Sequence, residues 1–161
     1  MLDGLYWYCH IRGRAPEGKA LFRLAETGLA PRAGEAPSLT WGRLLPRYED
    51  SAEDLRTRSE TALRIACHYE DEGEIAFATW RAGNYFAWLE QYAEAIPYFE
   101  RSLAQYQALG DAFYVGRVLF NLGFSRGLAL VTRRICARCR KGSPSAARMA
   151  TSHCWVTSCC T

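Results

Sequence analysis

Apolar residues recur at spacings of three and four along most of this chain, which is the period of an amphipathic helix rather than of a strand. The expected helices run from residue 2 to about 12, from 16 to 29, from 38 to 46, from 51 to 69, and then through 75–89, 95–106 and 115–122. The pattern therefore predicts an all-α chain whose helices form antiparallel pairs with short connections.

Turn and cap residues separate the apolar sets. Ser38 and Ser51 stand where an N-cap is needed, and Gly110-Asp111 combines a C-terminal glycine cap with an N-cap aspartate. A run of Pro, Gly and Ala from residue 30 to 37 breaks the period and is the only internal linker that the pattern suggests. Pro97 lies about one turn inside its helix, where a kink is tolerable.

The chain also repeats itself with a period of 40 residues. Four residues recur without change: Glu60, Leu63, Asp71 and Gly83 return as Glu100, Leu103, Asp111 and Gly123. Such a period is typical of stacked helical units, which bury their apolar faces only against one another. Their usual product is a binding surface rather than a catalytic pocket.

The segment from Trp80 to Leu103 resembles a tetratricopeptide repeat. The matching residues are a helix-contact glycine, two seam aromatics, two small residues and two apolar ones: Gly83, Phe86, Tyr92, Ala95, Ser102, Phe99 and Leu103. The resemblance implies a right-handed α-solenoid of helix pairs with a non-enzymatic, protein-binding role. It also implies that residues 1–130 form one repeat domain of about three and a half helix pairs.

The unit here is longer than the family's usual length of about 34 residues. Units of 40 look like the sensor arrays that follow an ATPase domain in bacterial signalling and transcription regulators of the maltose-regulator and NB-ARC type. No phosphate-binding loop of the pattern GxxxxGK[ST] occurs in this sequence. If the resemblance holds, the chain is a piece of a longer array.

A candidate partner-binding site follows from the same resemblance, because the first helix of each unit lines the concave face of the superhelix. Trp80, Asn84 and Trp88 fall four apart on one helix face, and the repeat places Phe120 and Phe124 beside them. The groove would suit a peptide or an amphipathic helix, with Asn84 available to hold a backbone amide. The alternative is that these aromatics simply pack against the neighbouring helix pair.

The end of the chain differs in composition from the rest. Residues 1–130 hold 14 Lys and Arg against 17 Asp and Glu, whereas residues 131–161 hold 6 against none, together with five of the seven cysteines. This tail offers possible zinc ligands, namely Cys136, Cys139, His153, Cys154, Cys159 and Cys160. Its basic residues could also meet phosphate groups of a nucleic acid or a membrane.

A third hypothesis for the tail is favoured. The repeat stops abruptly after about residue 124, and the loss of every acidic residue is what a shift of reading frame in a repeat gene would give. Finding no further repeat in the other reading frames would contradict this. A helix through Leu128, Val131, Ile135 and Cys139 would cover the exposed end of the stack, with residues 142–161 disordered.

Catalysis is not expected. His10, His68 and His153 lie on separate elements, and no Ser-His-Asp order or paired-carboxylate motif stands out. The sequence predicts no cofactor, no metal and no small-molecule substrate, with a protein or peptide as partner; a zinc- or thiol-dependent binding protein built on the tail is the alternative. Without a basic leader or an apolar run of about 18 residues, a cytoplasmic location is expected.

Overall fold

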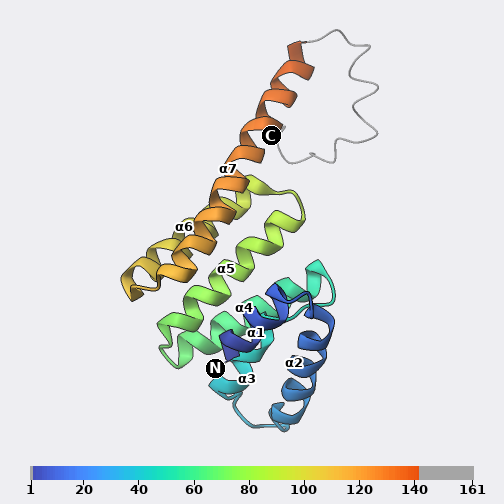
Figure 1. Ribbon diagram of the computed structural model, residues 1–161, viewed down its shortest axis with the longest axis vertical. Helices are drawn as coiled ribbons and strands as arrows, with labels where there is room; N and C mark the ends of the chain where they lie inside the picture. The colour runs from blue at the N-terminus through green and yellow to red at the C-terminus, as the bar shows by residue number, and fades with distance from the viewer. Residues whose placement is uncertain (1, 142–161) are drawn as a thin grey trace.

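The computed structural model describes residues 2–141, with side chains up to residue 135. The elements are α1 (Leu2–Ile11), α2 (Ala15–Leu29), α3 (Leu39–Leu44), the 3₁₀ turn η1 (Leu45–Arg47), α4 (Ala52–His68), α5 (Glu72–Trp88), α6 (Tyr92–Leu109) and α7 (Ala112–Lys141) (Figure 1). No strand occurs in this described part. The all-α prediction is confirmed.

The predicted caps begin and end the helices where expected. Ser38 accepts a hydrogen bond from the Trp41 amide at 3.2 Å, and Ser51 accepts one from the Asp54 amide at 3.1 Å. Gly110 ends α6 in the left-handed region at φ 70°, a conformation that costs glycine little. Residues 30–38 form no helix, so the predicted linker is also confirmed.

The 40-residue period corresponds to a structural repeat. Helices α4 and α6 begin 40 residues apart, at residues 52 and 92. Helices α5 and α7 have the same offset and begin at residues 72 and 112. Asp71 and Asp111 are the equivalent N-cap residues of α5 and α7. Each accepts a hydrogen bond from the backbone amide three residues on, at 3.0 and 3.1 Å. The sequence repeat therefore reproduces local structure as well as residue types.

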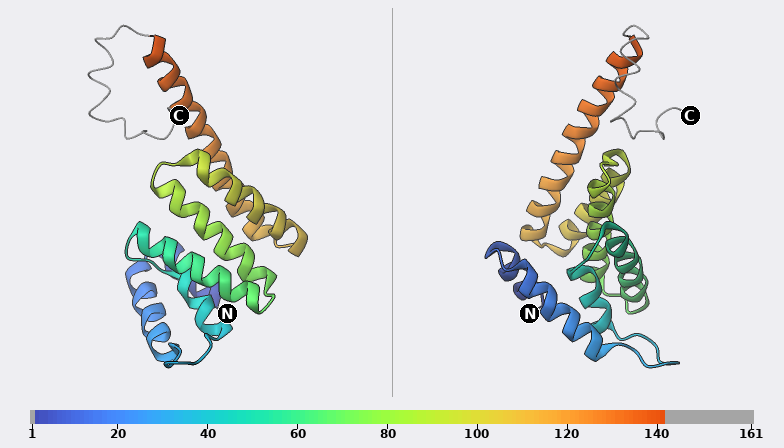
Figure 2. Two further views of the ribbon diagram at one scale, coloured as in Figure 1. Left: turned by 180° about the vertical axis from the view of Figure 1, so that it is seen from behind. Right: turned by 90° about the vertical axis from the view of Figure 1, so that its right-hand side faces the viewer.

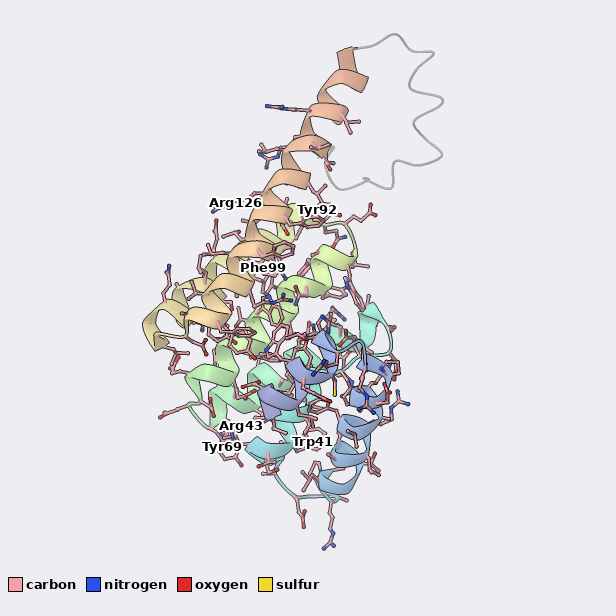
Figure 3. The ribbon with its side chains drawn as sticks, in the orientation of Figure 1. Trp41, Arg43, Tyr69, Tyr92, Phe99 and Arg126 are labelled. Carbon is pink, nitrogen blue, oxygen red and sulfur yellow. The ribbon has the colours of Figure 1, made fainter. Side chains whose placement is uncertain are left out.

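Helix α5 lies at the centre of the molecule and packs mainly against α4 and α6, its neighbours in sequence. A Cβ atom at Gly83 would lie 2.6 Å from Cε1 of Phe99, which is fully buried in α6 (Figure 3). One turn further along α6, Ser102 donates a hydrogen bond to the Ala76 carbonyl at 2.9 Å. The close contact that the resemblance predicted for Gly83 is therefore present.

Helix α1 returns to the helices at the other end of the described chain. Trp7 Nε1 donates a hydrogen bond to the Tyr114 hydroxyl at 3.1 Å, across 107 residues of sequence. The Trp7 ring lies 6.1 Å from Trp80 and 5.2 Å from Phe113, and Tyr6 meets Phe77 edge to face. The main core cluster consequently joins α1 to α5, α6 and α7.

A buried arginine fixes this arrangement. Arg47, at the end of η1, pairs with Asp3 of α1 at 2.6 Å and with Glu74 of α5 at 2.8 Å, and its guanidinium lies 4.5 Å from the centre of the Phe77 ring. Burial alone would lower the pKa of Arg47, but the hydrogen bonds and charges of Glu74 and Asp3 outweigh it and raise that pKa. Arg47 is therefore charged and ties three elements together.

Helix α7 departs from the prediction at its C-terminal half. It continues past Leu122 to Lys141 as one helix, and this half extends beyond all the other helices (Figures 1 and 2). The predicted helix through Leu128, Val131, Ile135 and Cys139 is present, but the expectation that it covers the end of the stack is wrong, because Val131 and Ile135 are at least half exposed. Nothing breaks the helix between residues 124 and 130, where Gly127 is tolerated within a helical run.

The boundary at residue 130 lies inside α7. The predicted disorder of residues 142–161 falls outside the described residues. Within the described part, none of the helices combines the length and the hydropathy that a membrane span requires.

Candidate binding groove

All five predicted partner-binding residues line one groove with a volume of about 700 Å³. Trp80, Asn84 and Trp88 come from α5, and Phe120 and Phe124 come from α7. Further lining residues come from α1, α2 and residues 47–49, chiefly Tyr6, His10, Lys19, Phe22 and Glu49. The fold thus brings together side chains that the repeat register alone had grouped.

Three of the five are exposed aromatic side chains. Trp88 is 57% exposed, Phe120 68% and Phe124 57%. The rings of Phe124 and Tyr92 pack edge to face, with 6.3 Å between their centres. Trp88 and Phe120 have no aromatic neighbour of this kind among the described residues. These three side chains therefore leave apolar surface in water along one groove.

Trp80 differs from these three. It is 2% exposed and packs with Trp7, Phe77 and Tyr114 at ring distances between 5.5 and 6.3 Å. For Trp80 the alternative of core packing is therefore correct, although its ring also forms part of the groove floor. Substitution of Trp80 would test the core rather than the groove.

Asn84 forms a polar link between α5 and α7. Its Oδ1 accepts a hydrogen bond at 2.6 Å from Nδ2 of Asn121, which also lines the groove. The side-chain oxygen that could have held a ligand's backbone amide is therefore engaged within the protein. The pair holds the two groove-lining helices in register.

Sequence reasoning missed the basic residues of the groove. Arg81 lies between Trp80 and Asn84 on α5, and Arg117 lies one turn before Phe120 and Asn121 on α7. Helical spacing could have placed both on the groove face, since 81, 84 and 88 share one side of α5 and 117, 120, 121 and 124 share one side of α7. The contribution of α1 and α2 had no such local signal.

The arginines of the groove have different partners. Arg81 donates a hydrogen bond to the Glu49 carboxylate, and its side chain is 7% exposed. The Arg117 guanidinium lies 4.5 Å from the centre of the Trp7 ring and forms no ion pair with any side chain that the structure describes. Arg117 is therefore the groove's unneutralised cation.

Tyr48 lines the groove and contacts α2 through Glu26. Its hydroxyl donates to the Glu26 carboxylate, and the Arg58 guanidinium lies 3.9 Å from the centre of its ring. Burial raises the pKa of Tyr48, and the hydrogen bond to Glu26 adds to this while the charge of Arg58 opposes it. Tyr48 is therefore a neutral side chain at ordinary pH.

A metal ion in a protein is bound by several His, Cys, Asp or Glu side chains that lie close together. No group of three or more His, Cys, Asp or Glu side chains is placed to hold an ion among the described residues. Cys9 is buried at the groove against Gly18, and Cys67 is exposed on α4; both are free thiols. The zinc ligands suggested for the tail lie outside the described side chains.

No protein-family model, curated protein or solved structure matches this chain.

Proposed function

We propose that this chain is a non-enzymatic protein-interaction module that binds a peptide or a partner helix in the groove between α5 and α7. In this proposal the helices pair antiparallel in a right-handed, tetratricopeptide-like α-solenoid. The shared 40-residue offset of helix starts and the contact of Gly83 with Phe99 support that arrangement. The module would act in the cytoplasm as a sensor segment of a larger regulator.

One observation carries the proposal. Trp88, Phe120 and Phe124 each expose more than half of their side-chain surface along a single groove of about 700 Å³. Complete burial of one such aromatic side chain contributes about 1.5–3 kcal/mol. Because all three are already partly buried, together they supply only part of the free energy that holds a short amphipathic segment, and the other groove contacts supply the rest against the cost of ordering it.

Selection from a random peptide library displayed on phage tests the proposal. The full chain is the bait, and a variant with Trp88→Ala, Phe120→Ala and Phe124→Ala is the comparison. We expect wild type to enrich a family of peptides with bulky apolar residues at helical spacing. The triple variant is expected to lose affinity for these peptides by about 100-fold or more, since each aromatic contributes as a contact residue.

The control variant carries Leu24→Ala. Leu24 is 72% exposed on α2 and does not line the groove, so it removes exposed apolar surface elsewhere. Its peptide affinities should equal those of wild type. Enriched peptides that bind the triple variant as tightly as wild type would overturn the groove, as would failure to enrich any family at all.

A further inference from the structure

Four buried polar atoms of the groove have no hydrogen-bond partner among the described residues. They are Trp80 Nε1, Arg81 Nε, Arg117 Nε and Ser125 Oγ. Trp80, Arg81 and Ser125 are only 2%, 6% and 1% exposed, so these atoms are not surface groups. Five further buried polar atoms without a partner among the described residues lie outside the groove, so this feature is not peculiar to it, and burial keeps a groove ligand away from the four atoms themselves. Arg117 is only half-buried, so the rest of its guanidinium can meet a ligand.

The chemistry of these atoms is one-sided. Indole and guanidinium N–H groups can only donate hydrogen bonds, and a serine hydroxyl can donate as well as accept. A ligand that meets the Arg117 guanidinium must therefore present acceptor oxygens. Hydrogen bonds from an arginine are strongest when the acceptor is itself charged, as a carboxylate is.

Most of the charged side chains that line the groove are cationic. Four cationic side chains line it, namely Lys19, Arg47, Arg81 and Arg117, against the single carboxylate of Glu49. Lys19, Arg47 and Arg81 are each paired with carboxylates, whereas Arg117 is not paired with any described side chain. The charge that a ligand could neutralise is therefore that of Arg117.

We infer that the groove takes an acidic peptide segment. A side-chain carboxylate of the segment pairs with Arg117, and an adjacent apolar side chain packs on Phe120 and Phe124. This inference rests on the proposed function, because it names the chemical class of the peptide. It adds the requirement for a carboxylate, which the exposed aromatic side chains of Trp88, Phe120 and Phe124 do not impose by themselves.

Binding of three synthetic peptides to the full chain, followed by fluorescence anisotropy, tests the inference. The first is an amphipathic helix of about 16 residues with Phe and Leu on one face, Glu on the flanks and both ends blocked. The second carries Gln in place of each Glu. The third is the Gln peptide with a free C-terminal carboxylate, which separates a side-chain carboxylate from a terminal one.

We expect the Glu peptide to bind about ten-fold or more tightly than the Gln peptide, with a difference that shrinks as salt rises. The free carboxylate should recover little of this difference. Arg117→Gln should remove most of it, and Arg117→Lys should retain part of it because the charge remains. Arg126→Gln is the matched control, since Arg126 is an α7 arginine outside the groove that pairs with Glu100.

Equal affinity for the Glu and Gln peptides would overturn the inference, as would a preference that survives Arg117→Gln. Full recovery by the free terminal carboxylate would replace the side-chain carboxylate with a terminal one. If both blocked peptides bind equally and the triple aromatic variant binds neither, the groove stands and only its acidic preference fails. Absence of binding by any of the three also overturns the acidic preference, and the library selection then decides the groove separately.

Discussion

At the scale of single residues, the two equivalent glycines of the repeat give a sharp contrast. A Cβ at Gly83 would lie 2.6 Å from the fully buried Phe99 ring, whereas a Cβ at Gly123 would meet nothing within 4 Å. We expect Gly83→Ala to lower the free energy of unfolding by about 1–3 kcal/mol through overpacking. Gly123→Ala should raise it by about 0.5–1 kcal/mol, because alanine favours a helix interior. Urea denaturation followed by far-UV circular dichroism measures both.

Gly116→Ala serves as a second open-space control within α7, since a Cβ at that position also meets nothing within 4 Å. Its effect should match that of Gly123→Ala. Two variants at 83 and 123 with the same sign of effect would contradict the packing argument. The repeat assigns both glycines to the same position, and only the position of the neighbouring helix distinguishes them.

At the scale of elements, α7 has two halves with different energetics. Val118 and Leu122 are buried against the other helices, whereas Leu130, Val131 and Ile135 are at least half exposed. We expect Leu122→Ala to cost about 2–5 kcal/mol of unfolding free energy. A variant with Leu130→Gln, Val131→Gln and Ile135→Gln should change it by no more than about 0.5 kcal/mol, as surface substitutions do. Thermal and urea unfolding report both, and a cost of several kcal/mol for the triple change would show that this half is packed.

The limits of most elements could be predicted from local chemistry. Ser38, Ser51 and Asp111 cap their helices through contacts within three residues, and contacts this local can be recognised from the sequence. The C-terminal half of α7 could not be predicted in the same way. Its apolar stripe has helical spacing, but whether that stripe is covered depends on the partner helix rather than on the stripe itself.

At the scale of the whole molecule, only part of the groove could be predicted from the sequence. The period of 40 and the helical spacing of four placed Trp88, Phe120 and Phe124 on one surface, because both are regularities of the chain. The burial of Trp80 was not predictable, since it depends on Trp7, which lies 73 residues earlier. Periodicity carries no information about contacts at such separation.

The return of α1 to α7 also bears on cooperativity. In a stack of repeats each unit contacts only its neighbours, so the ends can unfold separately. Here Trp7 joins α1 to Trp80 of α5 and to Tyr114 of α7, and we expect a single unfolding transition in urea. Tryptophan fluorescence and far-UV circular dichroism should then give the same midpoint. Trp7→Ala should lower the unfolding free energy by about 3–5 kcal/mol and separate the two midpoints, because it removes the contact between the ends.

Leu24→Ala controls for a change within the same N-terminal segment, as Leu24 is exposed on α2 and outside the main core cluster. Its two midpoints should stay coincident. Separate transitions in the wild-type protein would contradict the coupling through Trp7 and would favour independent units. Coincident midpoints that survive Trp7→Ala would place the coupling elsewhere. The contact of Tyr6 with Phe77 and the ion pairs of Arg47 with Asp3 and Glu74 also join α1 to α5, and they would be the remaining links.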